Sequence, residues 1–217
     1  MIDFAAAREA MVDSQVRTSD VTSYSVIEAM AWCPRERFVP DDWRGLAYAE
    51  TEIPLAEDRA MLTPRALAKM LDTAAITPDE LVLEIAPGTG YSTALIARLA
   101  ATVIAVEPDA ALAEESRRAL ADLEIFNVVV TEGASVDGDP KHAPYDVIFI
   151  NGAVEQVPST LTDQLKEGGR LIAIFLQDGV GQCRTLLRVG DTLAQQITYD
   201  IYGPLLPGFE RERSFAF

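Results

Sequence analysis

The sequence is short of histidine and cysteine. Its 217 residues include one histidine and two cysteines. Cys33 and Cys183 are too few for a disulfide framework or a four-ligand zinc site, so we interpret them as buried apolar residues. A single histidine excludes a metal site built from several histidines, and we expect no metal. His142 stands in a polar turn before an apolar run, which favours a loop residue over a member of a serine–histidine–acid triad.

Basic charge is the second shortage. Lysine and arginine number 18 against 34 aspartates and glutamates, which gives a formal net charge of −16. An acidic surface of this kind repels a phosphate backbone, so nucleic acid is not an expected partner. Apolar runs of roughly eighteen residues, long enough to span a bilayer, are also missing, as is a secretory signal at the N-terminus. We therefore expect a cytoplasmic protein with no membrane partner.

Length and composition fit one folded domain with additions. Hydrophobic residues make up 49% and charged residues 24% of the chain, as in ordinary globular proteins. Residues 1–75 are expected to form a helical N-terminal extension that caps the substrate side. Helices are predicted over 4–16 and about 23–33, and residues 34–60 are predicted to be mostly loop. Thr63 followed by Pro64 has the pattern of an N-cap and first helical residue.

A different pattern begins near residue 80 and defines the second part, residues 76–217. Five short apolar runs are bounded by turn residues, at 81–85, 102–106, 127–130, 147–150 and 171–175. Helical stretches at 91–100 and 109–121 separate the first three. Near-continuous apolar strands that alternate with helices predict a mostly parallel sheet covered on both faces, so the expected fold class is α/β, doubly wound.

The pattern changes again after residue 180. Residues 184–189 and 196–202 read as two strands joined at Gly190-Asp191. They predict a C-terminal β-hairpin that closes one edge of the sheet, followed by an irregular tail.

The most informative stretch runs from Leu83 to Tyr91, with the letters LEIAPGTGY. It follows the first strand and opens a helix, where glycines let the backbone approach a ligand and the helix N-terminus offers free N–H groups. Seventeen residues after Gly90, Glu107 ends the second strand. An acid at that position commonly binds the two ribose hydroxyls of an adenosine.

Two cofactor classes use this geometry. A dinucleotide site requires G-x-G-x-x-G, and Thr93 stands where the third glycine is needed. An S-adenosylmethionine site usually reads acid-x-G-x-G-x-G, which matches at Glu84, Gly88 and Gly90, with Ala86 in the first glycine's position. The pattern therefore favours S-adenosylmethionine over a nicotinamide dinucleotide, and a Rossmann-like methyltransferase over an oxidoreductase.

At this point the chain resembles the protein-L-isoaspartate O-methyltransferase family, over roughly residues 8–176. The stretches that carry the resemblance are 11–17, 34–40, 47–50, 82–85, 142–146, 157–158 and 164–171. The resemblance implies an enzyme that transfers a methyl group from S-adenosylmethionine to the carboxylate of isoaspartyl residues in damaged proteins. Its partner would be a protein or peptide that carries such a residue.

The resemblance also implies where the cofactor binds, and where this chain departs from the family. The family has a glycine–aspartate pair after its third strand, whose aspartate holds the adenine, and here the pair is Gly133-Ala134, with Ser135 as a weak substitute. The family's substrate-side serine falls on Leu62, with Thr63 one residue away. The expected cofactor-binding set is Glu84, Ala86, Gly88, Gly90, Tyr91, Glu107, Gly133, Ala134 and Asn151.

A carboxylate acceptor needs no general base, because its pKa near 4 leaves it ionised at neutral pH. Catalysis then depends on orienting the carboxylate toward the methyl group and on excluding water. Thr63, Arg59 and Asn151 are the expected catalytic residues. Arg59 or Arg65, which flank the turn at Leu62, would supply positive potential for the anion. Asn151 would end the fourth strand, at the edge of the sheet where ligands bind.

Two other interpretations stay open. One is a methyltransferase of the same fold with another acceptor, which the loss of the family serine motivates. The other is a catalytically inactive descendant that acts as an interaction module. The sequence makes no prediction about the oligomeric state.

Overall fold

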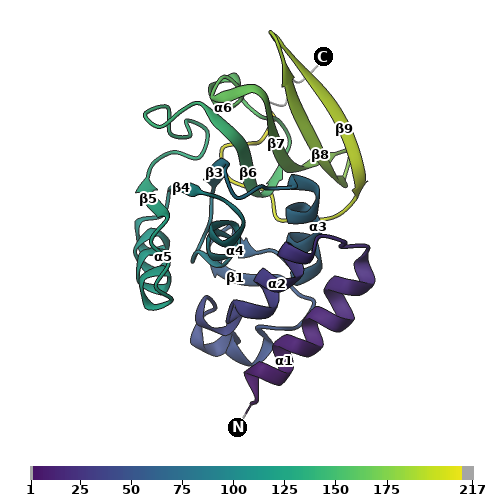
Figure 1. Cartoon of the computed structure of the whole chain (residues 1–217), viewed down its shortest axis with the longest axis vertical. Helices are drawn as coiled ribbons and strands as arrows, with labels where there is room; N and C mark the ends of the chain where they lie inside the picture. Colours follow the sequence, from purple (N-terminus) through teal and green to yellow (C-terminus); the bar gives the residue numbers. More distant parts are fainter. Residues whose placement is uncertain (1, 212–217) are drawn as a thin grey trace, which may run out of the picture.

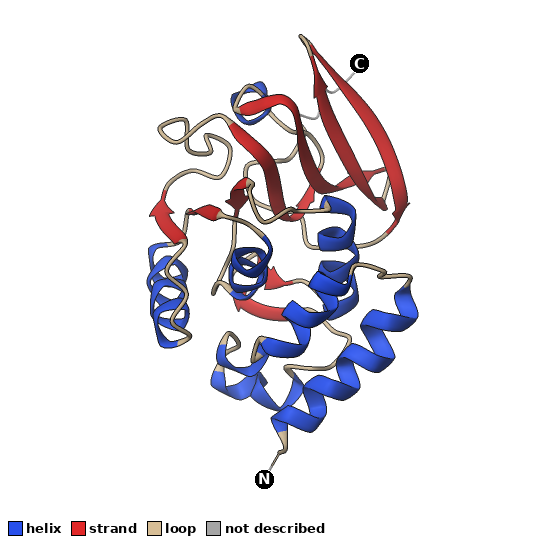
Figure 2. Ribbon diagram, viewed as in Figure 1, coloured by secondary structure: helices blue, strands red, loops and turns tan. Residues whose placement is uncertain are grey.

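The computed structural model describes residues 2–211, which contain a seven-stranded sheet. The N-terminal helices lie to one side of it (Figures 1 and 2). The strand order is β5-β4-β3-β6-β7-β8-β9. The first five of these strands are mutually parallel, which confirms the doubly wound α/β fold. They are β3 (Leu81–Ile85), β4 (Thr102–Glu107), β5 (Val128–Glu132), β6 (Tyr145–Val154) and β7 (Leu165–Gln177).

One face of the sheet is covered by helices. Helices α4 (Tyr91–Leu99) and α5 (Ala110–Asp122) connect β3 to β4 and β4 to β5, as expected. Both crossovers step in the same direction along the sheet, and their common right-handedness places both helices on this face. The N-terminal helices α2 (Tyr24–Trp32) and α3 (Pro64–Ala74) join the same hydrophobic core as α4.

The opposite face of the sheet is covered as well, but by loops and one short helix rather than by long helices. No helix connects β5 to β6 among the described residues, and α6 (Ser159–Thr162), before β7, has only four residues. Residues 133–144 hold two glycines and two prolines and have no helical periodicity, which explains the missing helix. Leu161, Leu206 and Phe209 cover this face instead.

The C-terminal hairpin is confirmed. Strands β8 (Val180–Val189) and β9 (Thr192–Asp200) are antiparallel to β7 and to each other. Residues 201–211 then return to β6, where the Ala153 N–H donates to the Pro204 carbonyl (2.8 Å) and the Leu206 N–H donates to the Ala153 carbonyl (2.9 Å). The tail up to residue 211 is therefore packed against the sheet, while 212–217 lie outside the described residues.

The N-terminal part has the helix that was predicted over residues 4–16 and, in addition, two strands that were not predicted. Helix α1 (Phe4–Met11) continues through a π-helical turn at Val12–Val16, and a short hairpin forms within the stretch predicted to be mostly loop. Its strands are β1 (Ile53–Ala56) and β2 (Arg59–Met61). Strands of three or four residues are too short to show a period in the sequence. No helix of residues 2–211 is long and apolar enough to cross a membrane.

Arg170 on β7 connects the N-terminal part to the sheet. Its guanidinium donates to the carbonyls of Ala74 (2.5 Å) and Ala75 (2.8 Å), at the end of α3. It also donates to both carboxylate oxygens of Glu80, at 2.7 and 2.9 Å. Burial alone would raise the pKa of Glu80, but donation from Arg170 and from the Thr77 N–H lowers that pKa below its usual value.

We expect Arg170→Ala to lower the free energy of unfolding by about 2 kcal/mol at pH 7, because Glu80 would lose a partly buried counter-ion. Urea denaturation measures this loss. The difference in the free energy of unfolding between variant and parent should shrink as the pH falls below about 4.5. The lowered pKa of Glu80 means that this carboxyl stabilises the fold only while it is ionised. Arg118→Ala is the control, because its 3.9 Å pair with Glu114 is exposed and should contribute under about 1 kcal/mol. Equal losses in the two variants would contradict the prediction.

Candidate functional site

The candidate site lies at the carboxyl ends of β3 and β4, where a loop of residues 86–90 leads into α4. Ala86, Gly88 and Gly90 have positive φ angles of 59°, 63° and 94°. A left-handed conformation costs alanine about 1–2 kcal/mol. The loop bears this cost and has at Ala86 the conformation that a glycine would adopt there. The Ala86 N–H donates to the Val106 carbonyl (2.9 Å), which ties the loop to β4.

Gly90 has two reasons to be glycine. Its φ is left-handed, and a Cβ atom there would lie 2.4 Å from the Ser116 Oγ on α5. We expect Gly90→Ala to cost about 2–4 kcal/mol of stability, the sum of backbone strain and overpacking. It should also weaken S-adenosylhomocysteine binding at least tenfold by moving the loop. Calorimetric titration and thermal unfolding measure the two effects.

Gly168 provides the matched control. Its φ is also positive (74°), but no atom lies within 4 Å of the added Cβ position. Gly168→Ala should therefore cost only about 1–2 kcal/mol and leave cofactor affinity unchanged. If both variants bind the ligand like the parent, contact between Gly90 and Ser116 has no role in shaping the loop.

Glu107, the last residue of β4, accepts four hydrogen bonds. Arg59 donates from Nη1 to Oε1 (2.6 Å) and from Nη2 to Oε2 (2.9 Å). The backbone N–H groups of Gly88 (2.8 Å) and Asp109 (3.1 Å) donate the other two. Both side chains are buried, with 8% of Arg59 and 0% of Glu107 exposed. The ion pair therefore joins the β1–β2 hairpin to the end of β4.

A cavity of about 240 Å³ adjoins this pair. Its lining residues are Arg59, Ala86, Pro108, Asp109, Ser135, Leu206 and Pro207. Four of these side chains are apolar, Ser135 adds a buried hydroxyl, and Arg59 and Asp109 are charged. The apolar part suits a flat aromatic base. Glu107, the acid expected to bind ribose hydroxyls, does not line the cavity itself and lies behind Arg59. The residues present therefore fit the adenosine part of S-adenosylmethionine, with Ala86 at the loop and Leu206 on the C-terminal segment.

Asn151 supplies a further polar group. Its amide donates to Ser92 Oγ (2.9 Å), while its Oδ1 atom is buried and has no hydrogen-bond partner among the described residues. A donor on a ligand would satisfy this acceptor. Asn151 lies inside β6 rather than at its end, at a break in the register between Phe149 and Ala153. The sequence underestimated the length of this strand, and Asn151-Gly152 is not a turn.

Glu84 is buried beneath α4, on the face of β3 opposite Leu83 and Ile85. Burial raises the pKa of Glu84 to about 7, and the nearby hydroxyls of Ser92 and Thr93 offset this only in part. Neither of its carboxyl oxygens has a well-formed hydrogen bond within residues 2–211. Glu84 does not line the 240 Å³ cavity.

Tyr91, which belongs to the expected cofactor-binding set, lies in the core and does not line the 240 Å³ cavity. Its ring is 1% exposed and packs between the Arg35 guanidinium (4.7 Å from the ring centre) and the Phe38 ring (5.7 Å between centres). These contacts hold the N-terminal extension against α4. The side chain that follows the glycine loop therefore serves the core.

The segment after β5 also differs from the prediction. Ala134 is exposed, and the neighbouring Ser135 lines the cavity. Gly133 has no side chain, and its backbone N–H donates to the Glu107 carbonyl (3.3 Å). Ser135, and not Ala134, is therefore the residue placed to contact an adenine.

The predicted substrate-side residues occupy three different environments. Thr63 caps α3, since its hydroxyl accepts from the Ala66 N–H (3.2 Å). Leu62 is buried in the core. Arg65 is exposed and pairs with Glu50 (3.2 Å). Arg59 is the only one of the predicted catalytic residues that lines the cavity.

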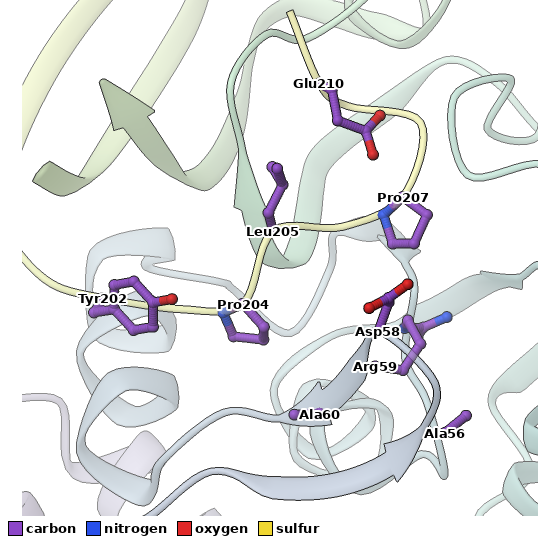
Figure 3. Close-up of a pocket in the computed structure, with 9 residues that line it drawn as sticks. All are labelled: Ala56, Asp58, Arg59, Ala60, Tyr202, Pro204, Leu205, Pro207 and Glu210. Carbon is purple, nitrogen blue, oxygen red and sulfur yellow. The ribbon is translucent and has the colours of Figure 1, made fainter. Parts of the chain in front are cut away.

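Arg59 also lines a second, larger cavity of about 590 Å³ (Figure 3). It lies between the β1–β2 hairpin and the C-terminal segment, from which Tyr202, Pro204, Leu205, Pro207 and Glu210 face it. Sequence reasoning missed this use of the C-terminal segment. Its prolines and glycines indicated an irregular chain but carried no signal of the surface on which it packs.

Comparison with known proteins places the chain among its relatives. Residues 6–196 match the family described as protein-L-isoaspartate(D-aspartate) O-methyltransferase. A protein-L-isoaspartate O-methyltransferase of Gloeobacter violaceus is 37% identical over 192 residues, which cover 88% of this chain and 94% of the relative. Another, from Roseiflexus sp., is 35% identical over 211 residues and 95% of each chain.

Two solved structures have a similar architecture. A protein-L-isoaspartate O-methyltransferase superposes with a TM-score of 0.82 at 25% identity, over 93% of this chain and 66% of the other. A putative protein-L-isoaspartate O-methyltransferase from Plasmodium falciparum, in complex with S-adenosyl-L-homocysteine, superposes with a TM-score of 0.79 at 17% identity. The superposed region covers 92% of this chain and 97% of the other, and at this identity it shows only that the two folds are similar. By its matched range, its two relatives and its fold, this chain belongs to the S-adenosylmethionine-dependent protein-L-isoaspartate(D-aspartate) O-methyltransferase family.

Proposed function

We propose that this protein methylates the carboxylate of isoaspartyl residues in damaged proteins. The observation that carries the proposal is the buried acid Glu107, which ends β4 beside the glycine loop and the 240 Å³ cavity, in a chain of this family. Glu107, the Gly88 backbone, Ser135 and Asn151 would hold the cofactor. When bound, S-adenosylmethionine supplies the methyl group from its sulfonium sulfur.

The chain's own residues would position the acceptor and exclude water. The acceptor carboxylate is ionised at neutral pH and needs no residue to remove a proton. The 590 Å³ cavity beside Arg59 is roomy enough for a peptide segment, and Leu205 and Pro207 form part of its wall. Held in line with the methyl group, the carboxylate would gain the advantage of well-oriented reactants, about 7–11 kcal/mol at best.

Roles for Thr63 and Asn151 in catalysis stay predictions. The Thr63 hydroxyl is engaged with the Ala66 N–H, so contact with a substrate would require it to leave the end of α3. Asn151 has a free acceptor and is the better placed of the two. Cytoplasmic location is likewise a prediction.

Methyl transfer from labelled S-adenosylmethionine to a synthetic isoaspartyl peptide tests the proposal. The matched control is the same peptide with a normal aspartate. We expect label on the isoaspartyl peptide, lost on mild alkaline treatment because a carboxyl methyl ester forms. If the protein binds S-adenosylhomocysteine but does not methylate this peptide, isoaspartyl residues are not its acceptor. That result would favour a methyltransferase with another acceptor, or an inactive protein that acts as an interaction module.

A further inference from the structure

The contacts of Glu107 leave no acceptor capacity for a ribose. An ionised carboxylate has about four lone-pair sites for hydrogen bonds. Arg59 takes two of them, and the N–H groups of Gly88 and Asp109 take the others. The two N–H groups belong to the backbone of the site. The Arg59 side chain is therefore the donor that must move before two ribose hydroxyls can bind Glu107.

We propose that Arg59 competes with the cofactor's ribose for Glu107, and that cofactor binding releases Arg59 to bind the acceptor carboxylate. The second half rests on the proposed function. Arg59 is suited to both positions because it lines the 240 Å³ cavity and the 590 Å³ cavity at once. It would thus contact the acceptor directly and couple the binding of the two ligands.

The charges around the larger cavity support this exchange. Asp58 and Glu210 line it, and both are acidic (Figure 3). Arg59 is the one cation among its lining residues in the part of the chain that the structure describes, and Glu107 neutralises it. Without the cofactor, an entering carboxylate would meet two anions and an engaged guanidinium. After the exchange it would meet a planar guanidinium with free donors, which suits a two-point contact with a carboxylate.

This arrangement makes the two bindings reciprocal. If the cofactor raises the affinity for the acceptor, the acceptor must raise the affinity for the cofactor by the same factor. The acidic protein would then bind its anionic acceptor more tightly in the loaded form than in the free form.

Titration with S-adenosylhomocysteine tests the competition without any acceptor. Arg59→Met should bind this ligand at least fivefold more tightly than the parent, because Glu107 is free for the ribose. Arg59→Lys keeps the charge but contacts fewer oxygens, so its affinity should lie between the two and its fold should be retained. Arg65→Met is the control, since Arg65 pairs with Glu50 outside both cavities, and its affinity should equal the parent's. Equal or weaker binding by both Arg59 variants would overturn the proposal.

A second titration tests the release of Arg59. In the parent, a saturating isoaspartyl peptide should tighten S-adenosylhomocysteine binding at least threefold, and this effect should vanish in Arg59→Met. The same variant should raise the peptide's KM at least tenfold. If saturating peptide does not tighten S-adenosylhomocysteine binding in the parent, the proposal that cofactor binding releases Arg59 is wrong. A parent that does not methylate the peptide would refute the proposed function, while the first titration would still decide the competition.

Discussion

Glu107→Ala should lose at least a hundredfold in affinity for S-adenosylhomocysteine and about 3–5 kcal/mol of stability, because it removes one partner of a buried ion pair. The Arg59 guanidinium, 8% exposed, would keep its charge without a counter-ion. The Gly88 and Asp109 N–H groups would lose their acceptor as well. Two ribose hydrogen bonds to a carboxylate, at about 1.5–3 kcal/mol each, account for the loss of affinity. Calorimetric titration and chemical denaturation measure the two effects.

Two controls separate the buried charge from the loss of the ligand contact. Arg59→Met combined with Glu107→Ala should recover most of the stability, since no unpaired charge remains, but should not recover binding. Glu132→Ala breaks the exposed pair with Arg117 (3.0 Å) and should cost under about 1 kcal/mol. Normal ligand affinity in Glu107→Ala would place the ribose elsewhere.

Glu84→Gln should make the protein more stable at pH 8 by up to about 3 kcal/mol. Burial raises the Glu84 pKa from 4.5 to about 7, so ionising this carboxyl in the fold is unfavourable, at about 1.36 kcal/mol for each pKa unit. Between these two values the folded state holds more protons than the unfolded state, and the stability of the parent falls as the pH rises. Glutamine stays neutral and lacks this decline.

Denaturation midpoints of parent and variant between pH 4.5 and 8.5 measure the effect. The two curves should meet near pH 4.5 and separate up to about pH 7. Glu28→Gln, at an exposed position on α2, is the control and should follow the parent throughout. A constant difference between Glu84→Gln and the parent at every pH would show that Glu84 is not protonated in the fold.

Much of the fold is predictable from the sequence. The apolar runs at 81–85 and 102–106 become β3 and β4, because strands buried on both faces are almost continuously apolar, here with Glu84 as the exception. Thr63 and Pro64 begin α3 through a side-chain cap and a fixed φ, which are local effects. The covering of the second face was not predictable, since loops and Leu206 supply it and leave no periodic pattern.

The sequence by itself determined the strands of the large sheet, the glycine loop and the position of Glu107, because each depends on neighbours a few residues away. Only the tertiary structure decided that Arg59, 48 residues earlier, pairs with Glu107. It also decided that Leu206 walls the cavity and that Tyr91 faces the core. Contacts between distant segments depend on how the sheet brings those segments together. The residues around each contact carry no local signal of which distant residue will be its partner.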